Sequence, residues 1–318
     1  MAFLTGSGAS LRLGKEESFG AAATADTLVD ITSESVSLSV EKGDSGSLLA
    51  SKTAESRDLL SVTVDGSFSF ILRPEGAALI THAALGGAER HTENAEDGTH
   101  THEFCLCGPA ETLPSITLLV DRKASVKKYP GVTVSALTLE CAAGDYVKGS
   151  IDLRGVKEEP GDRVSSPSSF TIPAYRCTAA VFKVGDEVFD ISSATFKVDN
   201  ALEDAPRTYA SGLYAGQPQH AKRSVTISFE IPYSGDVDAV RDRYLVSEEN
   251  VSVNLLFTSA DKEKQKYEIH MPFVSISSVS ASVGGTGALT ASAEGEALSV
   301  GSTEPLTISI TNTSAETV

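Results

Sequence analysis

Two stretches of the chain decide its fold: "SITLLVDRKASVKKYPGVTVSALTLE" (residues 115–140) and "SVNLLFTSADKEKQKYEIHMPFVSISSVSAS" (residues 252–282). Both begin with a short apolar run, cross a charged segment, and end in residues that alternate between apolar and polar. Such alternation is typical of a β-strand with one buried face. The two stretches therefore predict the same hairpin of two strands at two places in the chain.

The alternation breaks at a corresponding point in both final strands. The apolar positions change from even to odd numbers between Val134 and Leu137, and again between Ile276 and Val279. One extra residue in a strand causes such a change of face, and this irregularity is a β-bulge. A shared break predicts a bulge or a bend in both strands and indicates that the chain contains one structural unit twice.

An earlier strand also recurs. The stretch "DITSESVSLSV" is followed 160 residues later (190 − 30) by "DISSATFKVDN". This offset aligns Val36 with Phe196 and Leu38 with Val198. In both copies the aligned side chains lie on one alternating face of a predicted strand.

A strand followed by a helix completes the repeated unit. Residues 67–85 and 225–245 both lead from a strand, through a proline, into a helical pattern. Ser234 is a candidate N-cap for the second helix, and Gly86 and Gly87 end the first. The apolar residues at helical spacing are Leu79, Ile80, Ala83 and Ala84 in the first helix, and Val237, Val240, Tyr244 and Leu245 in the second.

These patterns predict a mainly β fold of two tandem β-sandwich or barrel-like domains, each with one short flanking α-helix. The charged and then Ser/Pro-rich stretch at residues 157–170 has the composition of a linker. The predicted domains are therefore residues 1–156, with an N-terminal arm, and residues 171–296. Residues 297–318 form an extra strand and a tail, with Leu306, Ile308 and Ile310 on one face of the strand.

Composition narrows the function. The formal net charge of the 318 residues is −17, which disfavours tight binding to nucleic-acid phosphates through a basic face. We expect neither a signal peptide in residues 1–20 nor a membrane-spanning helix, because no apolar run is long enough. Four cysteines are too few for a disulfide framework in a chain of this length, and free thiols fit a reducing cytoplasm.

The stretch "THTHEFCLCGP" (residues 99–109) is the strongest candidate for chemistry. In a regular strand, however, His100 and His102 point to one face, and Cys105 and Cys107 point to the other. Their spacings also differ from those of structural zinc sites. We therefore predict a strand that enters the hairpin of residues 115–140, with no metal. No catalytic motif or phosphate-binding loop is present in the sequence, so we predict no cofactor and no enzymatic activity.

Two segments are longer than ordinary hairpin connections and occupy equivalent places in the two copies. They are residues 43–58 and residues 200–223. Long loops with apolar side chains in a compact domain are often completed by a partner, although floppy loops or loops packed on themselves are the alternative. The apolar residues concerned are Leu48 and Leu49 in the first loop, and Tyr209, Leu213 and Tyr214 in the second.

The chain resembles the phage tail tube proteins, also called major tail proteins. The resemblance covers roughly residues 10–295. The stretches that carry it, in order, are "LRLGKEESFGAAATADTLVDITSESVSLSVEKGDSGS", "VDGSFSFILRPEGAALITHAALGG", "THTHEFCLCGPAETLPSITLLV" and "YPGVTVSALTLECAAGDYVKGSIDLRG". The resemblance implies a virion structural protein of the tail, assembled in the host cytoplasm, whose subunits form stacked rings around a channel for the genome.

Specific residue roles follow from this resemblance. It implies that the two long loops contact the neighbouring ring, that the N-terminal arm with Phe19 contributes, and that His102 and Phe104 are architectural. Six units per ring and an internal duplication favour a homotrimer with pseudo-sixfold symmetry over a hexamer. The implied partners are other copies of the chain, the tape measure, tail terminator and distal tail proteins, and genomic DNA passing an acidic lumen without specific binding.

A second class of protein fits the same composition. Two immunoglobulin-like sandwiches that act as an adhesive or decoration protein, binding a virion or cell surface, give a similar sequence pattern. Self-assembly separates the two classes, because a tube subunit forms rings or filaments while a binding module stays monomeric.

Overall fold

The structure is a computed structural model that describes residues 5–44, 56–164, 170–205, 207–233, 237–238, 241–259, 264–281 and 289–313. It is mainly β, as predicted, and its sheets are antiparallel. Among these residues the strands do not close into a barrel. No helix in the described part of the chain has the length and apolar character needed to cross a membrane.

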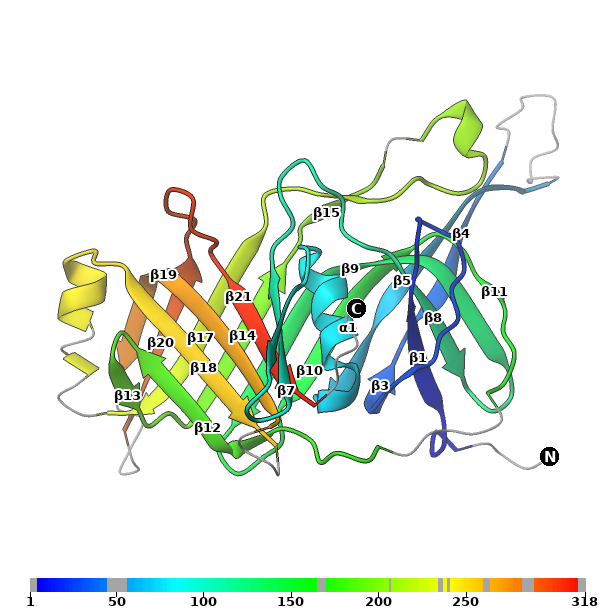
Figure 1. Cartoon of the computed structure of the whole chain (residues 1–318). Helices are drawn as coiled ribbons and strands as arrows, with labels where there is room; N and C mark the ends of the chain where they lie inside the picture. Colours follow the sequence, from blue (N-terminus) through cyan, green and yellow to red (C-terminus); the bar gives the residue numbers. More distant parts are fainter. Residues whose placement is uncertain are drawn as a thin grey trace.

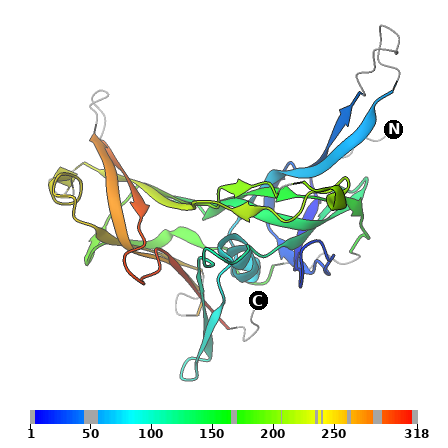
Figure 2. The same cartoon turned by 90° about the horizontal axis from the view of Figure 1, so that it is seen from above.

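The largest layer is a sheet that we call the platform (Figures 1 and 2). Seen from above, it forms a shallow arc with helix α1 (Pro74–Leu85) on the convex side (Figure 2). In pairing order its strands are β4 (Ser37–Gly43) with β3 (Ile31–Glu34), β5 (Asp58–Ile71), β10 (Lys148–Gly155), β9 (Val126–Ala142), β14 (Ser193–Asp199), β17 (Ser224–Pro232), β20 (Thr290–Ala297) and β19 (Lys266–Ala281).

Two smaller groups of strands lie on either side of α1 (Figure 1). One pairs with the first half of β9 and contains β2 (Thr27–Val29), β1 (Ser10–Lys15), β8 (Ile116–Asp121) and β11 (Glu159–Pro160). The other pairs with the first half of β19 and contains β13 (Glu187–Phe189), β12 (Arg176–Val184), β18 (Val251–Thr258), β21 (Thr307–Asn312), β7 (Thr99–Cys105) and β6 (Arg90–Asn94). The long strands β9 and β19 thus belong to both layers.

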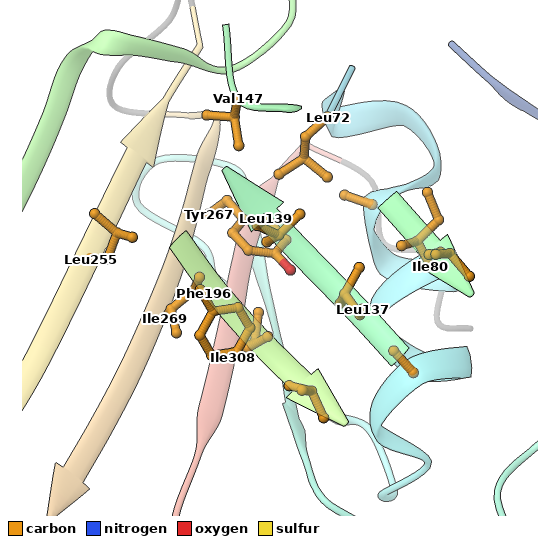
Figure 3. Packing of buried hydrophobic residues seen from close by; sticks show 14 of the residues in the cluster. Leu72, Ile80, Leu137, Leu139, Val147, Phe196, Leu255, Tyr267, Ile269 and Ile308 are labelled. Atoms are coloured by element: carbon orange, nitrogen blue, oxygen red, sulfur yellow. The ribbon is translucent and has the colours of Figure 1, made fainter. Parts of the chain in front are cut away.

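The core lies between the platform and these outer groups. Leu137 and Leu139 of β9 and Phe196 of β14 point from the platform into it, where Ile269 and Ile308 meet them (Figure 3). All five side chains are almost completely buried. Alternation along each strand produces this single packed face, because successive side chains point to opposite sides of a sheet.

The two predicted bulges are confirmed. In the pairing of β9 with β10, Ser135 is the extra residue between Val134 and Ala136. In the pairing of β19 with β20, Ser277 is the extra residue between Ile276 and Ser278. Each bulge lies where its long strand passes from the outer group into the platform, and it accounts for the change of parity in the sequence.

The first predicted helix is also confirmed. α1 starts at Pro74, ends at Leu85, and buries the four residues expected at helical spacing. Gly86 follows in the left-handed conformation (φ 77°), which suits glycine because it carries no Cβ. In the second copy the structure has a π-helix, η2 (Arg241–Val246), with Tyr244 and Leu245 half-buried, while Ser234 and Val240 lie outside the described residues.

The order of strand pairing recurs along the chain. β1, β8, β9, β10, β5 and β4 pair in that order, and so do β12, β18, β19, β20, β17 and β14. Leu38 lies opposite Val64 on β5, and Val198 lies opposite Val225 on β17. Traced across the paired strands from the two bulges, Leu38 and Val198 hold the same position, so the register agrees with the offset that aligned them.

One sequence prediction was wrong. β7 does not enter the hairpin of residues 115–140, because β8 pairs with β9 on one edge and β1 on the other. Instead β7 pairs with β6 and with the C-terminal strand β21. Leu306, Ile308 and Ile310 are buried, and β21 lies between β7 and β19. The C-terminal strand therefore occupies the place beside β7 where the hairpin of residues 115–140 was predicted.

Candidate functional site

The face of the platform that points away from α1 is rich in serine, threonine and charged residues. The burial pattern alternates along β14, β17 and β20: apart from Pro232 and Ala297 at the strand ends, the apolar residues are buried, and the residues between them are half-buried or exposed. Cross-strand neighbours therefore form polar rows that run across the sheet. One such row, in order, is Ser69, Ser150, Thr138, Lys197, Thr226, Glu296 and Ser275.

The charges on this polar face leave a negative excess. Its three basic side chains each have an acidic partner: Lys148 with Asp145 (2.5 Å), Arg154 with Asp65 (3.7 Å) and Asp204 (3.0 Å), and Lys197 with Asp199 (2.9 Å). In the part of the chain that the structure describes, no ion pair involves Glu140, Asp152, Glu230, Glu294 or Glu296. Those five carboxylates are exposed, so the surface repels anions.

Asp199 has a second stabilising contact. The backbone N–H of Ala201 donates to its carboxylate (2.9 Å), and together with Lys197 it lowers the pKa of Asp199 below the ordinary value. The adjacent side chain, Asn200, is completely buried. Its amide donates to the carbonyls of Ala84, at the end of α1, and Val134, just before the bulge (both 2.9 Å). This turn thus fastens the end of β14 to the first half of the chain.

The platform has two open edges among the described residues. At one end β4 pairs only with β5, and Leu38 and Val40 are 39 % and 46 % exposed. At the other end the last residues of β19, Ser278–Ala281, pair with β20 alone. In the middle, the corresponding edges of β14 and β9 pair with each other, from Ser193 opposite Ala142 to Asp199 opposite Ala136. We call this internal pairing the β9–β14 seam.

The second long loop reaches from the β14 end across to β5. β15 (Leu202–Glu203) and β16 (Gln219–His220) pair at its base, and the short helix η1 (Tyr209–Ser211) lies near its tip. The backbone N–H of Val62 on β5 donates to the carbonyl of Leu213 (3.0 Å), and Tyr214 forms a parallel bridge with Val62. Tyr209 is fully exposed, whereas Leu48 and Leu49 of the first loop lie outside the described residues.

The N-terminal arm is organised by a buried carboxylate. Phe19 is half-buried in the segment between β1 and β2. Glu16 accepts hydrogen bonds from the hydroxyls of Ser115 (2.6 Å) and Thr117 (2.7 Å) and from the backbone N–H groups of Gly131 and Gly20 (both 2.9 Å). Hydrogen bonds to an ionised group are stronger than neutral ones, so Glu16 fixes the start of the arm to β8 and β9.

The histidine and cysteine stretch forms a strand, as predicted. His102 is buried and hydrogen-bonds Glu89 (2.5 Å), and Phe104 is buried against the core. His91 of β6 stacks on both His100 and His102, with ring centroids 5.2 and 5.0 Å away. No cluster of three or more His, Cys, Asp or Glu suited to a metal occurs among the described residues.

The residues that the sequence analysis missed are polar, and two of them, Glu16 and Asn200, are buried. Glu16, Asn200 and Arg122, which donates two hydrogen bonds to the Glu34 carboxylate (both 2.7 Å), all join segments far apart in the chain. The periodicity of a sequence shows where apolar residues recur, so it does not reveal polar contacts between distant segments. One sequence signal did exist: Asn200 follows directly on the repeated strand that ends at Asp199.

A sheet with one packed face, one polar acidic face and an open edge at each end defines a class: a structural β-sheet subunit. No curated protein matches the chain. A family model for phage tail tube proteins matches residues 6–297, nearly the whole length. The chain therefore belongs to the phage tail tube protein family, whose members are structural rather than enzymatic components of the virion tail and assemble into a tube.

Proposed function

We propose that three copies of this chain close into a ring with pseudo-sixfold symmetry, and that rings stack into a tube through which the genome passes. In this proposal the chain is a tandem duplication of one tube domain, and each copy contributes one sixth of the ring. The recurrence of the same strand-pairing order on both sides of the β9–β14 seam is the observation that carries the proposal.

The seam also supplies a template for the contact between chains. Position by position, β3 and β4 correspond to β14, and the end of β19 after Ser277 corresponds to the end of β9 after Ser135. Within the chain, Val198 lies opposite Leu137 and Lys197 lies opposite Thr138. We therefore expect Leu38 of one chain opposite Val279 of the next, and Ser37 opposite Ser280.

This pairing would remove the open edges of the platform. An unpaired strand with exposed apolar side chains invites association with another strand, and closure into a ring satisfies every edge. Closure would also cover Leu38 and Val40, two of the apolar side chains that the isolated chain leaves exposed. The bend of β3 into β4 is held in place by Arg122, which binds the Glu34 carboxylate and the carbonyl of Val36 (2.6 Å).

The polar face would line the channel. It lies on the concave side of the arc, opposite α1 and the β6–β7 hairpin (Figure 2). The five carboxylates without an ion pair would repel the phosphate backbone of DNA, so the genome could slide past without specific binding. This arrangement supports the proposed acidic lumen.

Contacts along the tube would involve the two long loops and the arm with Phe19. Tyr209, fully exposed near the tip of the second loop, is the best placed of the candidates for stacking of rings. Leu213 and Tyr214 already contact β5 of the same chain through their backbones, so their side chains would contribute beside that contact. The ends of the tube would meet the tape measure, tail terminator and distal tail proteins, after assembly in the host cytoplasm.

Cryo-electron microscopy of filaments assembled from the purified chain tests the symmetry. We expect three chains per ring, each contributing two similar lobes. Six chains per ring would overturn the trimer with pseudo-sixfold symmetry while leaving the tube intact. A protein that stays monomeric at high concentration would instead favour an adhesive or decoration role.

A cysteine pair tests the register between chains. The double variant Ser37→Cys/Ser280→Cys should form an interchain disulfide in assembled rings, because the two residues face each other in the proposed pairing. The matched control, Ser37→Cys/Ser278→Cys, displaces one cysteine by two residues on the same face and should cross-link much less. Equal cross-linking in both variants would rule out the register, and cross-linking only in the control would assign a different one.

A further inference from the structure

Two cysteines lie together where the two halves of the chain meet. Cys141 is near the end of β9, opposite Ala194 in the β9–β14 seam, and Cys177 is the second residue of β12. The backbone N–H of Cys177 donates to the carbonyl of Asp145 (2.9 Å), and Tyr146 forms an antiparallel bridge with Arg176. The turn after β9 and the start of β12 therefore run side by side.

The two thiols are neighbours. The side chains of Cys141 and Cys177 are close enough for a hydrogen bond between their sulfurs. Both residues are buried, and both line a cavity of about 220 Å³ whose other walls include Phe182, Phe189 and Ser193. A disulfide requires two cysteines on adjacent segments with side chains directed toward each other, and the shared cavity places these two in that way.

The environments of the two thiols shift their pKa values in opposite directions. The hydrogen bond from Cys141 holds the pKa of the Cys177 thiol below its ordinary value. The same hydrogen bond, together with burial, raises the pKa of the Cys141 thiol. Cys177 is also the more exposed of the two, at 9 % against 6 % for Cys141. Because exchange needs a thiolate that the oxidant can reach, Cys177 is the sulfur that attacks first and Cys141 is the one that resolves.

We propose that Cys141 and Cys177 form an oxidation site that closes into an intramolecular disulfide, with a small-molecule disulfide as the oxidant. The Cys177 thiolate attacks one sulfur of the small disulfide, forms a mixed disulfide and releases one small thiolate. The Cys141 thiolate then attacks the Cys177 sulfur, forms the intramolecular bond and releases the second small thiolate. Two protein thiols are oxidised, one small disulfide is reduced, and the two protons pass to the released thiols.

The disulfide would tie together the ends of a long segment. Residues 142–176 lie between the two cysteines and include β10, β11 and the stretch with linker composition. Cross-linking the ends of such a loop stabilises a protein chiefly by restricting its unfolded chain. The bond would lock the end of β9 to β12 and so reinforce the junction beside the seam. This inference concerns the single chain and does not depend on ring symmetry.

The other two cysteines provide a matched control. The Cys107 sulfur accepts a hydrogen bond from Arg223 (3.2 Å), and Cys105 is the less buried of the two. The experiment incubates the folded full-length chain with oxidised glutathione, then counts thiols after denaturation and maps cross-linked peptides by mass spectrometry. It compares the natural chain with Cys105→Ser/Cys107→Ser and with Cys141→Ser.

In the natural chain the thiol count should fall from four to two, with a peptide pair linked through Cys141 and Cys177. The Cys105→Ser/Cys107→Ser variant should form the same link and lose both of its remaining thiols. The bond should raise the melting temperature by about 5–10 °C, from the usual stabilisation by a disulfide in a chain of this size. Cys141→Ser should stop at the glutathione adduct of Cys177.

Several results would overturn the proposal. Four thiols left after oxidation would show that the pair does not react. A link between Cys105 and Cys107, or stable glutathione adducts on both Cys141 and Cys177, would show that the reactive chemistry lies elsewhere or does not close. Circular dichroism of each variant before oxidation confirms that the folded chain is the species measured.

Discussion

The middle of the platform and its two ends contain equivalent strand edges, which are paired in the middle and open at the ends. Val198, in the middle, is completely buried because β9 pairs with its strand, whereas Leu38, at the corresponding position, is 39 % exposed. The sequence pattern is the same at both places. The difference shows that burial here depends on whether the neighbouring strand is supplied by the same chain, and an open edge of this kind marks a surface for association.

The two copies also differ in how their first strands are connected. Between β1 and β2 the chain makes the long arm that Glu16 holds in place. Between β12 and β13 it makes a tight turn, in which Gly185 has a positive φ of 63° and Glu187 is exposed. A buried carboxylate thus holds the connection after the first strand in one copy, whereas a turn at a glycine makes that connection in the other.

An aspartate at the two matched edge positions should produce the largest contrast. Val198→Asp places an unpaired carboxylate in the core, and we expect a loss of more than about 4 kcal/mol of stability, enough to prevent folding. Leu38→Asp should change the stability of the isolated chain by less than about 0.5 kcal/mol, since its side chain is partly exposed, but should block filament assembly. Urea unfolding and electron microscopy measure the two effects.

The contrast would fail if Leu38→Asp assembled normally, because β4 would then not be an assembly edge. Val40→Ser offers a second variant on the same strand, with a smaller expected defect in assembly. If Val198→Asp folded with the stability of the natural chain, the inference that Val198 is buried at the β9–β14 seam would be wrong.

The second largest effect concerns the arm. Glu16→Ala should lower the unfolding free energy by about 3–5 kcal/mol, because it leaves two backbone N–H groups and two hydroxyls without their acceptor. Glu16→Gln, which retains the shape and part of the hydrogen bonding, should lose less. The matched change in the other copy, Glu187→Ala, should leave the unfolding free energy measured by chemical denaturation almost unchanged. Equal losses at both positions would contradict the difference between the copies.

The third effect concerns the turn that joins the two halves. Asn200→Ala removes two hydrogen bonds to the carbonyls of Ala84 and Val134 and should cost about 2–3 kcal/mol. At the corresponding place in the first copy, Val40→Ala should be almost neutral in the isolated chain because the side chain is 46 % exposed. Thermal melting of both variants at low concentration provides the comparison.

Much of this fold could be predicted from the sequence. Parity breaks located both bulges, the spacing of apolar residues located α1, and the offset of 160 residues matched Leu38 with Val198. These features depend on the local alternation of side chains, which a sequence displays directly. The partner of β7 could not be predicted, because the choice between β8 and β21 depends on which edge is already occupied.

Less of the candidate site could be predicted from the sequence. The sequence revealed the acidic charge and the long loops, but it did not show that all three basic residues of the polar face are paired. It also pointed to "THTHEFCLCGP" as the strongest candidate for chemistry, whereas the two cysteines that line one cavity are Cys141 and Cys177, which are distant in the sequence. Pairing between distant side chains depends on tertiary packing, and periodicity carries no information about it.

The smallest expected effect tests the charge at the seam. The backbone N–H of Ala201 and the ammonium of Lys197 lower the pKa of Asp199, so its ionised form stabilises the folded chain at pH values above the ordinary aspartate pKa. That stability is lost as the pH falls through the lowered pKa. Because the side chain is 37 % exposed, solvent screening limits the contribution to about 0.5 kcal/mol.

Asp199→Asn keeps an acceptor for the Ala201 N–H but removes the charge. Its stability should therefore be slightly lower than that of the natural chain at pH 7, and the two should converge as the pH falls from about 4 to about 2. Ser39 holds the matching position at the open edge and does not titrate, so Ser39→Asn should leave the pH profile unchanged. If Asp199→Asn and the natural chain differed by the same amount at every pH, the loss would come from geometry rather than from the charge at the seam.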